Sequence, residues 1–193
     1  MDGQYRVAEC KMNLEEYFKR IGFHGSNEKL DLATLKLIHK QHVMSIPFEN
    51  LSIHCGEKII MDLEVIFNKI VRSSRGGWCL ENNFLFGWVL RIYGFTLVPR
   101  DADHFFETSH TLQTDPSSLF TNKSICSLQT PAGFRALIGW TYSEVTYKPV
   151  EGVDVLDMRD IPDDEIEQIL KEKFSVKLPN KLKPINNKAW YTL

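Results

Sequence analysis

Hydrophobic residues recur at helical spacing along the first half of the chain. The first apolar stripe follows Asn13, which can cap a helix together with Glu16 in a capping box, and it ends at Gly22, which suits a helix C-terminus. Two further stripes, each opened by an aspartate suited to an N-cap, cover residues 31–46 and 62–70. Three amphipathic helices have to bury their apolar faces together, so the pattern predicts a small helical bundle.

A fourth helical pattern begins at Cys79 and ends near Gly94, after which the spacing of apolar residues becomes strand-like. Residues 130–133 form a turn between two apolar runs, which predicts a β-hairpin. Strands are predicted at residues 95–98, 124–128, 134–140 and 141–147, and helices at residues 101–106, 116–120 and 162–174. The predicted fold class is α+β, with helices first and antiparallel strands after.

The stretch Arg75–Asn83 (RGGWCLENN) carries the candidate chemistry. Gly76 and Gly77 allow a sharp turn and the close approach of a substrate, and they lead directly into Cys79 at the start of the fourth helix. A helix N-terminus and the charge of Arg75 both favour a thiolate, so we expect the pKa of Cys79 to fall from ~8.5 into the range of about 3.5 to 7.5. Cys79 is therefore the candidate nucleophile. On the local pattern alone, a buried and inert cysteine is an equally good interpretation.

Composition and charge narrow the class of protein. The 193 residues are 43% hydrophobic and 25% charged with a net charge of -2, so bulk charge favours neither nucleic acid nor an anionic membrane. No apolar run reaches the ~20 residues of a membrane span, and the N-terminus lacks the order of a signal peptide, which predicts a cytoplasmic protein. The cysteines show no metal-ligand spacing, and His39 and His42 lack a third ligand nearby, so we expect surface histidines and no metal.

The motif around Cys79 resembles the nucleophile motif of the arylamine N-acetyltransferases, Arg-Gly-Gly-x-Cys-x-Glu-x-Asn. The similarity extends over nearly the whole chain, through residues 31–35, 46–51, 114–120 and 126–131. It implies acetyl transfer from acetyl-CoA, as co-substrate, to arylamines or arylhydrazines through an acetyl-Cys79 thioester. It also implies a cysteine-protease-like family fold: a helical bundle, a β-barrel and an α/β lid. We therefore divide the chain into a loose extension at 1–11, a helical bundle at 12–94 and a remnant of barrel and lid at 95–193.

One part of the family pattern is not found. The family's catalytic histidine and aspartate lie on barrel strands after the nucleophile helix, the aspartate in an Asp-x-Gly-Phe-Gly motif, and no such motif follows Cys79. The only later histidines are His104 and His110, in a segment that resembles a later part of the family. The interior of the barrel is therefore predicted to be missing, whether by splicing, by an error in the gene model or by deletion. Impaired catalysis, unpaired strand edges and possible self-association follow from such a loss.

The resemblance assigns CoA contacts to Thr111, Ser117 and Trp190. Thr111 stands where the vertebrate enzymes carry a tyrosine, Ser117 is equally suited to cap a helix, and Trp190 is equally suited to anchor the tail. One alternative function is a catalytically inactive form that binds a partner such as a full-length homologue. Another is a cysteine hydrolase that uses Cys79 with His104 and either Asp101 or Asp103.

Overall fold

The structure is a computed structural model that describes residues 12–25, 31–92 and 103–187. The N-terminal extension at 1–11, the predicted strand at 95–98 and Trp190 therefore lie outside the described residues. Within the described ranges, no helix combines the length and the hydrophobicity needed to cross a bilayer.

Helices fill the first half, as the apolar pattern predicts. They are α1 (Leu14–Ile21), α2 (Leu32–Ser45), α3 (Leu51–His54), α4 (Leu63–Phe67), which continues as the π-helix η1 (Asn68–Arg72), and α5 (Cys79–Ile92). The predicted N-caps are confirmed, because the side chains of Asn13, Asp31 and Asp62 each accept a backbone N–H from the first turn that follows. Gly22 ends α1 in the left-handed conformation.

The helix α3 was not predicted, and the helix predicted at 62–70 continues to Arg72 as a π-helix. Two side chains of the helical half also differ from the prediction. Glu16 makes no capping box, because its carboxylate pairs with Arg72 at 2.9 Å. His42 is buried rather than on the surface: its Nδ1 lies 2.8 Å from the Tyr17 hydroxyl and its ring packs against Phe86. The helix turns His42 toward the core while Leu32, which belongs to the same predicted stripe, is exposed.

The second half forms most of a five-stranded antiparallel sheet in the order β1-β2-β3-β4-β5. Its strands are β1 (Phe48–Glu49), β2 (Ile125–Thr130), β3 (Gly133–Ile138), β4 (Thr141–Lys148) and β5 (Val153–Asp160). The hairpin of β2 and β3 and the continuation into β4 are confirmed. Neither β1 nor β5 was predicted. In the described residues the sheet is open, with β1 and β5 as its edges.

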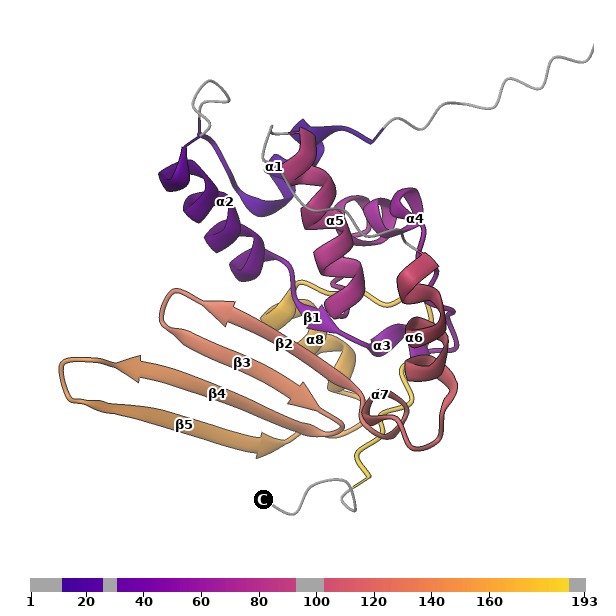
Figure 1. Cartoon of the computed structure of the whole chain (residues 1–193). Helices are drawn as coiled ribbons and strands as arrows, with labels where there is room; N and C mark the ends of the chain where they lie inside the picture. Colours follow the sequence, from indigo (N-terminus) through magenta and orange to yellow (C-terminus); the bar gives the residue numbers. More distant parts are fainter. Residues whose placement is uncertain (1–11, 26–30, 93–102, 188–193) are drawn as a thin grey trace, which may run out of the picture.

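Three helices accompany the strands: α6 (Asp103–Thr114), α7 (Leu119–Asn122) and α8 (Ile166–Phe174). The first is longer than predicted, and α7 begins later than predicted because Ser118 caps it. Helix α8 lies against one face of the sheet, where Ile169, Leu170 and Phe174 join Leu137 and Tyr142 in a second apolar cluster. Strands β4 and β5 extend away from the helices (Figure 1).

Asn50 joins the two halves of the molecule. Its side-chain Nδ2 donates to the carbonyls of Phe120 and Lys123 at 3.0 and 2.7 Å, and its Oδ1 accepts the N–H of Ile125 at 2.7 Å. Beside it, β1 pairs with β2. The segment around β1 is thereby tied to the sheet, and it contacts the turn at residues 75–78 before Cys79, which we call the nucleophile turn after the candidate role of Cys79.

Candidate active site

Cys79 is the first residue of α5, as predicted, and its side chain is exposed. The turn before it is held by backbone hydrogen bonds to β1. Gly77 N–H donates to the Pro47 carbonyl at 3.2 Å, and Glu49 N–H donates to the Gly77 carbonyl at 3.1 Å. A Cβ on Gly76 would overlap the carbonyl oxygen of Pro47, so glycine is needed there to let the two segments approach.

Arg75 is buried beneath this turn with its charge fully paired. Its Nε lies 3.0 Å from Glu49 Oε1, its Nη1 lies 2.9 Å from Glu57 Oε2, and its Nη2 donates to Ser52 Oγ at 3.1 Å. The expectation that Arg75 activates the thiol is therefore wrong. Because two carboxylates neutralise the guanidinium, it supports the turn instead.

The pKa of Cys79 lies above its ordinary value, contrary to the prediction. Loss of water around the partly covered thiol is the main cause, and the Glu81 carboxylate adds to it. The N–H groups of Leu80 and of Cys79 itself act in the opposite direction, as expected for a helix N-terminus. Their effect is smaller than the effect of desolvation.

Glu81, in the first turn of α5, stabilises the nucleophile turn through a side-chain hydrogen bond. It is 1% exposed, both of its oxygens lie 2.9 Å from Lys69 Nζ, and its Oε2 accepts the N–H of Trp78 at 3.1 Å. The next residue, Asn82, donates from its side chain to the Gly77 carbonyl at 2.7 Å. Sequence reasoning missed Lys69 as a partner. The sequence offered one indication of this pairing: Lys69 lies at the end of the helix predicted at 62–70, shortly before the Arg75–Asn83 motif.

Among the described side chains, no histidine hydrogen-bonds Cys79. His42 is engaged with Tyr17, and His54 Nε2 lies 3.0 Å from the Lys123 carbonyl. Lys123 also hydrogen-bonds Asn186 through its Nζ. The side chains of Asp103 and His104 and the whole of Asp101 lie outside the described residues. The described part of the chain contains no group of three or more side chains suited to a metal ion.

A groove of about 270 Å³ lies between α2, α5 and the strands β2 and β3. Five aromatic rings contribute to its lining, namely His39, His42, Phe48, Phe86 and Phe134. Asn82 and Asn83 also line it, and they follow Cys79 by three and four residues, so they lie on the same face of α5. Sequence reasoning did not find this groove, because its walls come from four separate segments.

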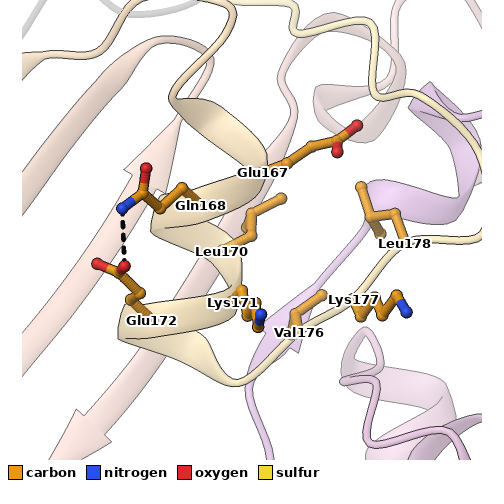
Figure 2. A pocket seen from close by; sticks show the side chains of 8 residues that line it. All are labelled: Glu167, Gln168, Leu170, Lys171, Glu172, Val176, Lys177 and Leu178. Atoms are coloured by element: carbon orange, nitrogen blue, oxygen red, sulfur yellow. Dashed lines mark hydrogen bonds between the residues drawn. The ribbon is translucent and has the colours of Figure 1, made fainter.

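A larger cavity of about 450 Å³ lies beside α8 (Figure 2). Leu170, Val176 and Leu178 provide its apolar lining, and charged side chains such as Glu167 and Lys177 surround them. Among the described residues that line it, none belongs to the nucleophile turn, and neither Thr111 nor Ser117 is among them.

Known proteins resemble this chain in sequence and in fold. The model of a family described as N-acetyltransferase matches residues 31–97 and 90–183. The chain belongs to this family.

Individual relatives are similar to this chain over most of its length. The arylamine N-acetyltransferase pineal gland isozyme NAT-10 of Gallus gallus is 34% identical over 290 residues, covering 94% of this chain and all of the relative. The liver isozyme of Gallus gallus is 32% identical over 284 residues. Among solved structures, the arylamine N-acetyltransferase of Nocardia farcinica has the same fold, with a TM-score of 0.76 and 21% identity over 92% of this chain and 94% of that one.

The positions that the resemblance to arylamine N-acetyltransferases assigns to CoA are only partly described. Thr111 is exposed on α6. Ser117 is exposed in the turn before α7, where its N–H and Oγ both donate to Asp115 Oδ1 at 2.7 Å, and Ser118 rather than Ser117 caps the helix. The Phe120 ring of α7 packs edge-on against Trp78 at 5.4 Å, so this segment lies next to the nucleophile turn.

Proposed function

We propose that this chain transfers an acetyl group from acetyl-CoA to an arylamine or arylhydrazine through an acetyl-Cys79 thioester, at a rate reduced by the absence of a catalytic histidine and aspartate. The observation that carries the proposal is the placement of Cys79, exposed at the N-terminus of α5 on a turn fixed from below by Glu81 and β1. Membership of the N-acetyltransferase family supports it.

The chemistry is a two-step exchange at one sulfur atom. The Cys79 thiolate attacks the thioester carbonyl of acetyl-CoA, the new carbon–sulfur bond forms, and CoA leaves as its thiolate. The amine nitrogen then attacks the acetyl-Cys79 carbonyl, Cys79 leaves as thiolate, and the ammonium proton passes to solvent. An oxyanion forms in both steps, and the N–H groups of Cys79 and Leu80, which act on the Cys79 sulfur at the helix N-terminus, are the candidate donors.

A shortened interior explains why the rate should be low. The alignment to the Gallus gallus NAT-10 isozyme extends over 290 residues although this chain has 193, and the two parts of the family match meet at residues 90–97. Both facts support the loss of an internal segment there, with the barrel strands that carry the family's histidine and aspartate. Removal of one member of such a triad typically lowers the rate by about 10⁴-fold.

The finer assignments belong to the same proposal. Thr111 and Ser117 contact CoA from the α6–α7 segment beside Trp78, the open sheet is the remnant of the barrel and lid, and the aromatic groove beside α5 receives the aryl ring of the acceptor. The free thiols of Cys55, Cys79 and Cys126 suit a reducing cytoplasm.

An inactive form is the second candidate function, and the raised pKa of Cys79 favours it. A thiol that remains protonated at neutral pH and has no described base beside it is a poor nucleophile. Such a chain would act, if at all, by binding a partner. The hydrolase alternative rests on His104, whose side chain is not among those described.

Intact-mass spectrometry after incubation with acetyl-CoA separates these functions. We expect one acetyl adduct in the wild type, none in Cys79→Ser, and an unchanged adduct in Cys55→Ser, which replaces a buried thiol. Addition of an arylamine should then discharge the adduct. Folded protein without an adduct would overturn the transferase proposal in favour of the inactive form.

A further inference from the structure

The Lys69–Glu81 ion pair joins the helix of Cys79 to the preceding π-helix. Lys69 comes from η1 and Glu81 from the first turn of α5, and the single ammonium group contacts both carboxylate oxygens at 2.9 Å. Glu81 Oε2 also accepts the N–H of Trp78, the residue immediately before Cys79. One carboxylate therefore connects η1, the turn and the nucleophile helix.

We propose that Glu81 is a positioning residue for Cys79, that it acts through the N–H of Trp78, and that Lys69 holds its carboxylate in place. The inference rests on the proposed function of Cys79 as nucleophile. Neither side chain touches the reacting sulfur in this role. The pair sets where the thiol stands and how strongly a nearby negative charge opposes its ionisation.

The charges around Glu81 show why Lys69 is needed. Glu81 is almost fully buried and its pKa is raised, because burial and the nearby Glu49 carboxylate raise it by more than Lys69 and the Trp78 N–H lower it. Lys69 Nζ also lies 3.9 Å from Glu49 Oε1, and Glu49 pairs in turn with Arg75. Lys69 therefore stands between two buried carboxylates. Removal of the cation would leave a buried carboxylate uncompensated, which destabilises its position.

Glu81 also has an electrostatic cost for the nucleophile. Its negative charge raises the pKa of Cys79. The contact that fixes the position of the thiol therefore also lowers the fraction of thiolate. Glutamine at position 81 keeps an oxygen that accepts the Trp78 N–H and removes the charge. This difference separates positioning from a purely structural role.

The test is the pH profile of Cys79 alkylation by iodoacetamide, measured at the Cys79 peptide by mass spectrometry. Glu81→Gln should lower the apparent pKa of Cys79 by about 0.5 to 1 unit. Lys69→Met should not lower it, because an unpaired Glu81 still carries its charge at the alkaline pH where the thiol titrates. Lys69→Met should also lower the Tm by at least about 6 °C, since it leaves a buried charge unpaired.

The double variant Lys69→Met/Glu81→Gln completes the cycle. It removes both charges, so it should recover at least half of the Tm lost by Lys69→Met and show the lowered pKa of Glu81→Gln. Lys148→Met, which breaks an exposed pair with Glu151, is the control and should change neither quantity.

The proposal is overturned if Glu81→Gln leaves the alkylation pKa unchanged, or if the double variant is no more stable than Lys69→Met. Alkylation needs no acetyl-CoA. A positive result here together with no acetyl adduct would therefore reject the transferase function and keep the positioning pair.

Discussion

Five charged side chains lie close together beneath Cys79, and every one of them has a partner. Arg75 pairs with Glu49 and Glu57, and Lys69 pairs with Glu81. Charges buried in this way stabilise a geometry only as long as each keeps its counterion, because an unpaired buried ion costs several kcal/mol. The two cations therefore fix the turn before Cys79, and the pKa of the thiol stays raised because desolvation outweighs the effect of the helix N–H groups.

His42 gives the stability of the fold a pH dependence. Burial lowers its pKa from the usual 6.5 to about 4, and the neighbouring His39 and Arg20 add to this effect. Below pH 6.5 His42 binds a proton in the unfolded chain but stays neutral in the folded chain. The free energy of unfolding therefore falls as the pH drops from 6.5 toward 4. The full loss is about 3 kcal/mol.

Urea unfolding at pH 7.5 and pH 4.5 checks this prediction. His42→Gln cannot take up a proton, so its stability should decline less between the two pH values than that of the wild type. The exposed His110→Gln variant should follow the wild type. Equal declines in His42→Gln and wild type would contradict the prediction.

The short strand β1 organises the elements around the site. Its two residues pair with β2 on one side and bridge to Gly77 on the other, so the nucleophile turn is attached to the sheet through β1. Phe48 also packs near the Phe120 ring of α7. Helix α5, the turn and the α7 segment are thus held in one arrangement by an element of only two residues.

Gly76→Ala tests how much this close approach contributes. The added Cβ would overlap the Pro47 carbonyl and lie 2.8 Å from Glu49 Cγ, so β1 and the turn would have to separate. We expect a loss of about 1–3 kcal/mol in the free energy of unfolding, together with faster alkylation of a less constrained Cys79. Ser73→Ala, at an exposed position just upstream, should change neither measurement. Unchanged stability in Gly76→Ala would mean that the turn does not need this contact.

At the scale of the whole molecule, the edge strand β5 leaves apolar side chains exposed to solvent. Every residue of β5 is exposed, and Leu156 and Met158 are 57% and 59% exposed on one face of that strand. Val153 and Val155 are exposed on the opposite face. Asp154, Asp157 and Asp160 partly protect the strand, since charged edge residues discourage pairing with another chain.

We expect the chain to self-associate through this side as its concentration rises, because exposed apolar strand faces favour association. Light scattering across a concentration series measures the effect. The variant Leu156→Lys/Met158→Lys should remain monomeric at concentrations where the wild type associates. Val150→Lys adds a lysine at a fully exposed turn position and should behave as the wild type does. Association that is unaffected by the double substitution would place the contact elsewhere.

Local chemistry explains which features were predictable from the sequence. Helix caps at Asn13, Asp31 and Asp62, the hairpin of β2 and β3, and the start of α5 at Cys79 all depend on residues within a few positions of one another. Such local hydrogen bonds form independently of how the distant parts of the chain pack. The predicted position of the nucleophile and the α+β class follow from them.

The amino-acid sequence by itself determined the longer helices of the first half, the hairpin and the place of Cys79. Only the tertiary structure decided what surrounds that thiol. Arg75 meets Glu49 across 26 positions and Lys69 meets Glu81 across 12, so their charges cancel, whereas the sequence alone suggested that Arg75 was free to act on Cys79. Partial desolvation of the Cys79 thiol raises its pKa for the same reason: desolvation and ion pairing depend on which distant segments pack together, and no local spacing of residues specifies that.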